Sequence, residues 1–188
     1  MKTRLTRHMR NFLNWFRLPR GLGFSGKGST FSFPRIVRGR EHIRIGTNSH
    51  VGSQGWIECF SEYAGDKFTP EIVIGDNVQI GRFVTVTAIS SVKIGDYCLF
   101  SEHVYISDHA HDVFGLEHTS LVSRRLLPKG DVSIGAYCFL GFRAIVLPGV
   151  TLGDRCVVGA GSVVTKSFPE GSIIAGAPAR LIRTLNYD

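Results

Sequence analysis

The stretch from residue 134 to residue 164, IGAYCFLGFRAIVLPGVTLGDRCVVGAGSVV, places an aliphatic residue at every sixth position. The aliphatic positions are Ile134, Leu140, Val146, Leu152, Val158 and Val164. Glycine follows four of these six directly, and a second position, four residues after each aliphatic one, holds small or medium side chains such as Cys138 and Ala144. Two inward-facing positions in every six residues predict a short strand followed by a turn.

The same six-residue spacing occurs earlier in the chain. It joins Ile45, Val51 and Ile57, then Ile74, Ile80 and Val86, and then Ile94, Phe100 and Ile106. An amphipathic helix would repeat at three and four residues and an ordinary strand at two, so neither accounts for this pattern. Three hexads would instead close one triangular coil, and successive coils would stack their aliphatic rows. The sequence therefore predicts an all-β solenoid.

Two motifs near the C-terminus narrow the prediction. They are IVLPGVTLG at residues 145–153 and VVGAGSVVTKSFPEGSIIAGAPARLIR at residues 157–183. Together with the hexads they resemble the hexapeptide-repeat, acetyl-CoA-dependent sugar O-acetyltransferases, both the lipopolysaccharide and capsule enzymes and the galactoside and maltose group. The resemblance implies a left-handed parallel β-helix, a homotrimer, acetyl-CoA as co-substrate without a metal, and a sugar or glycan acceptor in surface polysaccharide biosynthesis.

The predicted domain organisation follows the hexad register. A basic arm covers residues 1–42, the β-helix covers residues 43–171, and a cap covers residues 172–188, in which Ala179–Thr184 is expected to form a short helix. The register is lost between Ile106 and Ile134, which predicts an excursion loop at residues 107–131. Long loops on rigid scaffolds often carry functional residues.

Composition and charge point to one globular domain with a distinct N-terminal arm. The chain has 188 residues, 43% of them hydrophobic, and a formal charge of +7. Residues 1–44 contain eleven Lys or Arg but only one acidic residue, Glu41. Without a secretory h-region or an apolar run of about 18 residues, the expected compartment is the cytoplasm. No nucleic-acid recognition motif accompanies the basic residues, so no nucleic-acid partner is expected.

The arm has the pattern of a basic amphipathic helix. Its apolar positions are Leu5, Met9, Phe12 and Phe16, with arginines between them. Such a helix can lie on an anionic membrane surface, so residues 1–18 are a candidate peripheral membrane contact. Packing on a neighbouring subunit, where the arm would cap the open end of the solenoid, is the alternative.

Coenzyme A needs a narrow groove and cations for its phosphates. The glycine-rich run at residues 159–161 allows close approach of a ligand to the backbone, and nearby cationic side chains can neutralise phosphates. By resemblance, the cofactor-binding residues are Gly141, Ala160, Thr165, Lys166, Arg180 and Arg183. The alternative is that these segments only terminate the solenoid.

The segment ISDHAHDVF at residues 106–114 contains the candidate catalytic histidines. By resemblance, the general base lies five residues after the last aliphatic position, at His111, and the backbone amide of Phe142, from a neighbouring subunit, stabilises the oxyanion. An imidazole with a pKa near 6.5 suits proton removal from a sugar hydroxyl at neutral pH. His109 is expected to shape the acceptor pocket or the loop, and Asp108 or Glu117 to orient the imidazole.

Three residues are candidates for acceptor binding: Asp108, Arg82 and Tyr105. An N-acetyltransferase for a nucleotide-linked amino sugar, and a β-helix scaffold without activity, remain alternatives. Histidines and carboxylates in this loop could also bind zinc, but no second hexad offers partner ligands, so no metal is expected. The cysteines at 98, 138 and 156 share one inward position of the hexad and are interpreted as core residues.

Overall fold

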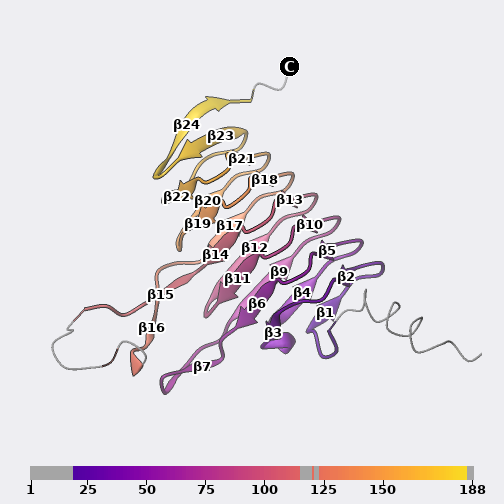
Figure 1. Ribbon diagram of the computed structural model, residues 1–188, viewed down its shortest axis with the longest axis vertical. Coiled ribbons are helices and arrows are strands. Elements are labelled where there is room, and N and C mark those ends of the chain that lie inside the picture. The colour runs from indigo at the N-terminus through magenta and orange to yellow at the C-terminus, as the bar shows by residue number, and fades with distance from the viewer. Residues whose placement is uncertain (1–18, 115–119, 121–122, 186–188) are drawn as a thin grey trace, which may run out of the picture.

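The computed structural model describes residues 19–114, 120 and 123–185, and it is a β-helix with three parallel sheets (Figure 1). Sheet A contains β1 (Phe24–Ser25), β4 (Ile43–Ile45), β9 (Glu71–Ile74), β12 (Ser91–Ile94), β17 (Val132–Ile134) and β20 (Thr151–Leu152). Sheet B contains β2 (Thr30–Phe31), β5 (His50–Val51), β10 (Gln79–Ile80), β13 (Leu99–Phe100), β18 (Phe139–Leu140), β21 (Val157–Val158), β23 (Ser172–Gly176) and β24 (Ala179–Thr184). Sheet C contains β3 (Ile36–Arg38), β6 (Trp56–Cys59), β11 (Thr85–Ala88), β14 (Tyr105–Ser107), β19 (Ile145–Val146) and β22 (Val163–Val164).

The aliphatic hexad positions form continuous columns inside the solenoid. In sheet A the aligned residues are Ile45, Ile74, Ile94, Ile134 and Leu152, each at most 2% exposed. Full burial of each such side chain stabilises the fold by about 1.5–3 kcal/mol. The spacing within a column is 18 residues from Ile134 to Leu152 and 20 from Ile74 to Ile94. The hexad prediction of the core is therefore confirmed, and individual coils tolerate two extra residues at a corner.

Two hairpins leave the solenoid at the carboxyl end of sheet C strands. The first joins β7 (Glu62–Tyr63) to β8 (Asp66–Lys67), after β6. The second joins β15 (His109–His111) to β16 (Leu126–Pro128), after β14, within the predicted excursion loop. Both project from the same flank of the molecule in Figure 1. A short 3₁₀ turn, Arg40–His42, leads into β4.

The β-helix begins earlier than the predicted boundary at residue 43. Strands β1, β2 and β3 pair in parallel with β4, β5 and β6 and so form a first coil. The hexad positions of this coil, Ser25, Phe31 and Val37, are six residues apart, but Val37 lies eight residues before Ile45. This break in register and the polar Ser25 hid the first coil in the sequence. Residues 1–18, with the predicted amphipathic helix, lie outside the described residues.

The C-terminal segment is a strand, and the predicted short helix is wrong. After a turn at Gly176, Ala177 and Pro178, β24 pairs antiparallel with β23. The last coil would otherwise expose the unpaired backbone groups of β23, and β24 supplies their hydrogen-bonding partners. Arg180 and Arg183 consequently lie along an extended strand instead of on one helical face. Strand β23 also extends sheet B beyond residue 171, where the solenoid was predicted to end.

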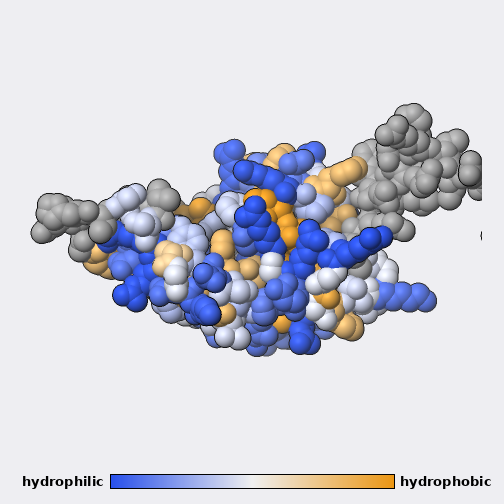
Figure 2. Space-filling view, turned by 90° about the horizontal axis from the view of Figure 1, so that it is seen from below, coloured by the Kyte–Doolittle hydropathy of each residue, from blue (hydrophilic) through white to orange (hydrophobic). Residues whose placement is uncertain are grey.

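One face of the molecule is polar apart from a narrow apolar band. Figure 2, which looks at the molecule from below the view of Figure 1, shows this band between polar side chains. No helix in the described residues is long and apolar enough to cross a membrane. All four cysteines are buried and free, and the thiols of Cys98, Cys138 and Cys156 contact carbonyl oxygens of the next coil at 3.1–3.2 Å. These three residues are therefore core residues.

Backbone stacking at the corners gives a testable prediction. A Cβ atom at Gly95 would lie 2.6 Å from the amide nitrogen of Ala136 in the next coil. We expect Gly95→Ala to lower the free energy of unfolding by about 1–3 kcal/mol, because the coils would have to separate. Gly55→Ala is the matched control, since its Cβ would meet its nearest neighbour at 3.5 Å, and we expect a change within about 0.5 kcal/mol. Denaturant unfolding measures both, and equal losses would refute the close-packing account.

Candidate functional site

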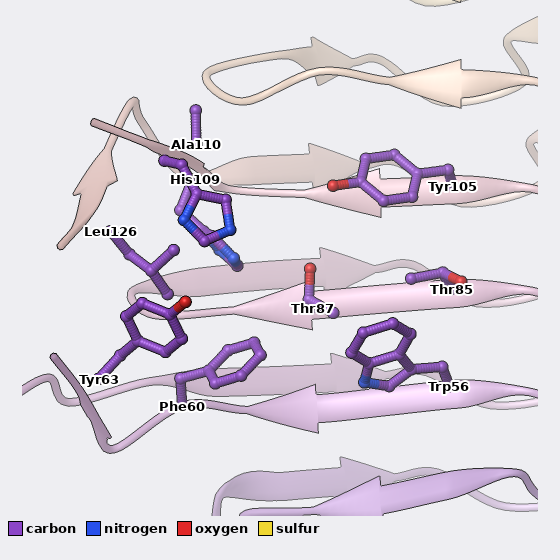
Figure 3. Close-up of a pocket in the computed structure, with 10 residues that line it drawn as sticks. Trp56, Phe60, Tyr63, Thr85, Thr87, Tyr105, His109, Ala110 and Leu126 are labelled. Atoms are coloured by element: carbon purple, nitrogen blue, oxygen red, sulfur yellow. The ribbon is translucent and has the colours of Figure 1, made fainter. Parts of the chain in front are cut away.

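The two hairpins and the outer face of sheet C enclose a cavity of about 240 Å³. Its lining residues come from three successive coils and both hairpins: Trp56, Phe60, Tyr63, Thr85, Thr87, Tyr105, His109, Ala110, His111 and Leu126. Figure 3 shows two ends, with Trp56, Thr85 and Tyr105 at one and His109, Phe60, Tyr63 and Leu126 at the other. Thr87 lies between the two ends. Both sequence-predicted histidines therefore lie in the cavity.

His109 is held by a buried carboxylate. Its Nδ1 lies 2.7 Å from Oδ1 of Asp108, and the His109 side chain is only 9% exposed. Asp108 is fully buried, and its oxygens also accept hydrogen bonds from the backbone amides of Ile89, at 3.0 Å, and Ser90, at 2.7 Å. These bonds fix the carboxylate to the preceding coil. With Nδ1 bonded to the carboxylate, Nε2 of His109 is free to act as the acceptor nitrogen.

His111 has a different environment although it is only two residues away. It is exposed, and its ring packs edge-on against Tyr63 with centroids 5.6 Å apart. On the same side, the ring of His109 packs edge-on against Phe60, also at 5.6 Å. The first hairpin thus supplies one aromatic neighbour to each histidine. Among the contacts described, a buried carboxylate partner distinguishes His109 from His111.

The other end of the cavity carries a fixed indole ring. Nε1 of Trp56 donates a hydrogen bond to Oε2 of Glu58 at 2.6 Å. Glu58 is 5% exposed and also pairs with the guanidinium of Arg38 at 3.5 Å. On the outer face of sheet C, Trp56 aligns with Thr85 and Tyr105 of the next two coils. The indole is therefore held in one orientation beside two side chains that line the cavity.

A buried thiol adjoins the site without taking part in it. Cys59 ends β6, and burial together with the carboxylate of Asp108 raises its pKa to about 12. A thiol in this environment stays protonated and is a poor nucleophile at neutral pH. The described residues contain no group of three His, Cys, Asp or Glu side chains placed to hold a metal ion. The chemistry of the cavity is thus that of an imidazole, hydroxyls and aromatic rings.

Several known proteins resemble this chain in sequence. Residues 131–166 match the family model described as the hexapeptide repeat of succinyl-transferase. The chain is 35% identical over 163 residues to an Escherichia coli K12 protein, WbbJ, described as a lipopolysaccharide biosynthesis O-acetyl transferase, with coverage of 83% of this chain and 79% of that protein. It is also 32% identical over 157 residues to the galactoside O-acetyltransferase of Escherichia coli K12, covering 82% of this chain and 73% of that one. The chain belongs to the hexapeptide-repeat acetyltransferases.

Solved structures agree on the fold. AntD, an N-acyltransferase from Bacillus cereus solved with dTDP-4-amino-4,6-dideoxyglucose and coenzyme A, superposes with a TM-score of 0.74 at 17% identity. The superposition covers 100% of this chain and 93% of AntD. The expected left-handed β-helix is confirmed, and this member of the hexapeptide-repeat acetyltransferases is an acyltransferase enzyme.

The residues that the family resemblance assigns to coenzyme binding lie in two groups. Gly141 packs directly on Ala160, where an added Cβ would lie 2.6 Å from the Ala160 nitrogen, at the corner before sheet C. Arg180 pairs in β24 with Ala175, which contacts Gly159 at the same corner, and Arg183 lies farther along β24 opposite Ile173. Thr165 and Lys166 follow β22 at the opposite end of sheet C.

The remaining predicted residues also divide between these two ends. Phe142 is at the corner between β18 and β19, where it packs edge-on against His103 and accepts a hydrogen bond from the amide of Gly161. Arg82 pairs with Glu102 at 2.8 Å and does not line the cavity, whereas Tyr105 does. Asp108 lies behind His109, without the exposed surface that acceptor binding would need. Glu117 lies outside the described residues.

Sequence reasoning missed the first hairpin and the aromatic residues that line the cavity. Trp56 on β6, Phe60 after it and Tyr63 in the hairpin had no assigned role. A signal was present, because 29 residues separate the aligned positions Ile45 and Ile74 whereas 20 separate Ile74 and Ile94. An excess of nine residues in one coil indicates an excursion there. The sequence could therefore have predicted two projecting segments on the same sheet.

The hydrogen bonds of Asp108 give a second prediction. Asp108→Ala leaves the buried amides of Ile89 and Ser90 without acceptors, so we expect a loss in the free energy of unfolding of about 1–3 kcal/mol for each amide. Asp131→Ala is the control, because that exposed carboxylate accepts a bond only at the surface, from Ser90 Oγ, and a change below about 1 kcal/mol is expected. Denaturant unfolding compares the two. Similar values for both variants would argue against the structural role of Asp108.

Proposed function

We propose that this enzyme transfers the acetyl group of acetyl-CoA to a hydroxyl of a sugar in bacterial surface polysaccharide or lipopolysaccharide biosynthesis. The observation that carries the proposal is the Asp108–His109 pair at one end of an aromatic-lined cavity. The proposal is supported by the descriptions of its relatives, a lipopolysaccharide biosynthesis O-acetyl transferase and a galactoside O-acetyltransferase. Hydroxyl acylation needs a base of modest strength, which an oriented imidazole supplies.

His109 is the proposed general base. The carboxylate of Asp108 accepts a hydrogen bond from Nδ1–H of His109, which leaves Nε2 to take the proton of the acceptor hydroxyl. The hydroxyl oxygen then attacks the thioester carbon, a C–O bond forms, and the tetrahedral intermediate expels the coenzyme A thiolate as the C–S bond breaks. The imidazolium returns its proton to this thiolate. The resemblance alone assigns the base to His111, for which the described residues include no such carboxylate partner, so the geometry favours His109.

Coenzyme binding in this proposal requires a second copy of the chain. Phe142, Gly141 and Ala160 lie before sheet C, whereas His109, Thr165 and Lys166 lie after it. A single chain cannot bring both ends of a sheet to one thioester. The expected homotrimer would juxtapose the histidine end of one subunit with the Phe142 corner of the next, where the Phe142 amide could meet the oxyanion. The close Gly141–Ala160 packing and the open space around Gly161 leave room for the pantetheine arm.

The residues of the cavity favour a neutral hydroxyl acceptor over a nucleotide-linked amino sugar. The lining residues in the described part of the chain include no Lys or Arg to pair with a diphosphate and no Asp or Glu to pair with an ammonium group. AntD was solved with a nucleotide-linked amino sugar, and its 17% identity shows the common fold alone. Acylation of an amine is therefore the alternative outcome of the assay below.

The roles of the two histidines are tested by single substitutions. Release of coenzyme A thiol is followed with methyl glycosides as hydroxyl acceptors and glucosamine as the amine acceptor. We expect the native enzyme to prefer the hydroxyl acceptors, and His109→Ala to lower kcat by about 10²- to 10⁴-fold, the usual contribution of a general base. His111→Ala is the matched control and should lower kcat less than tenfold.

Binding of acetyl-CoA, measured by thermal shift, should persist in both variants. A large loss in His111→Ala with a small one in His109→Ala would return the base to His111. Preference for glucosamine with the acetyl group found on its nitrogen, as an amide, would overturn transfer to a hydroxyl, and absence of acetyl-CoA binding by the native protein would favour a scaffold.

A further inference from the structure

We propose that the tryptophan end of the cavity is a second acceptor subsite, which binds the pyranose ring linked to the sugar that is acetylated at the histidine end. The inference rests on the proposed function and specifies its substrate class: a saccharide of at least two rings. It starts from the division of the cavity into two ends, each with its own aromatic side chains.

The cavity is longer than a single pyranose ring. Trp56 and Phe60 both line it, and they lie on one continuous extended segment, since the amide of Phe60 still bonds to the carbonyl of Ala88 in the next coil. Four residues of extended chain span about 13 Å. Phe60 is the residue in contact with His109. A single pyranose seated for reaction at His109 would therefore leave Trp56 out of contact.

The side chain of Trp56 is held in one orientation. A tryptophan on an outer sheet face would ordinarily sample several rotamers, and restricting it to one rotamer costs conformational entropy. Here the indole N–H is bonded to Glu58, a carboxylate that is itself 5% exposed and paired with Arg38. Such a fixed ring is preorganised to stack on a flat ligand. Glu58 is a positioning residue in this account because it acts through Trp56.

The side chains at the tryptophan end suit a sugar ring as ligand. The C–H face of a pyranose packs on the electron-rich face of an indole, and ring hydroxyls can bond to side chains such as Thr85, Thr87 and Tyr105. A nucleobase could stack on the same ring, but its diphosphate would then lie between the two ends, at Thr87. None of the described lining residues there is cationic, and the carboxylate of Glu58 aligns with Thr87 across the sheet. These charges favour a neutral second sugar ring.

The test compares acceptors of one and two rings. The kcat/KM for coenzyme A release is measured with methyl glucoside and methyl galactoside, with methyl maltoside, cellobioside and lactoside, and with UDP-glucose. We expect at least one disaccharide to exceed its monosaccharide by about tenfold or more, as one well-stacked ring provides. Trp56→Ala and Glu58→Ala should reduce this ratio to near one, while Glu58→Gln, which keeps an acceptor for the indole N–H, should preserve most of it.

Two controls keep the result specific. Tyr97→Ala removes an aromatic side chain that stacks on Tyr137 away from the cavity, so the disaccharide ratio should not change. The chain has two tryptophans, so Trp15→Phe leaves Trp56 as the single tryptophan, which is excited selectively at the red edge of the absorption band. In that protein, each disaccharide that is acetylated should cause a saturable change in fluorescence, and the matching monosaccharide a smaller one.

The subsite is overturned if the native enzyme uses one-ring and two-ring acceptors equally, if Trp56→Ala leaves the ratio intact, or if UDP-glucose is the best acceptor and loses its advantage in Trp56→Ala. Failure of the proposed function is a different result. In that case no sugar is acetylated, and the fluorescence titration with the disaccharides still decides whether the subsite exists.

Discussion

The stacking of one coil directly on the next is the constraint on which the rest of the structure depends. The parallel strands of the coils find their hydrogen-bonding partners in the adjacent coils, and neighbouring strands must lie about 4.7–4.9 Å apart. That spacing is possible only where the corners are narrow, as at Gly95 and Gly135, and where the interior columns contain side chains of matched size. The six-residue repeat in the sequence reflects this requirement for stacking.

The candidate site occurs where the chain departs from the repeat. Both hairpins leave sheet C at the carboxyl ends of strands, after Cys59 and after Ser107, and the second departure is fastened by Asp108. The same carboxylate that pairs with the amides of the preceding coil also holds His109. The buried side chain of Asp108 therefore has both a structural and a chemical role. Through it, the rigid solenoid fixes the position of the His109 imidazole.

The sequence predicted the columns, the parallel coils and the excursion after Ile106 because a six-residue period has few structural solutions. It did not predict that Ala179–Thr184 would be a strand, since the need to pair the open edge of β23 is visible only once the coils are stacked. The two histidines looked equivalent apart from their distance to Ile106. Their difference depends on the side-chain direction of Asp108, which spacing does not encode. Tyr63 reaches the cavity through a hairpin without a repeat, and Trp56 faces outward beside the inward hexad position Ile57, so the hexad register gave neither a role.

The identity of the bond formed tests the central claim most directly. The enzyme is incubated with acetyl-CoA labelled with ¹³C at the carbonyl carbon and with the methyl disaccharides, and the product is examined by ¹³C NMR. The account predicts a single new ester carbonyl, correlated through three bonds to one sugar ring proton. Label found only in free acetate, or no transfer to any of these hydroxyl acceptors while an amino sugar becomes labelled as an amide, would contradict it.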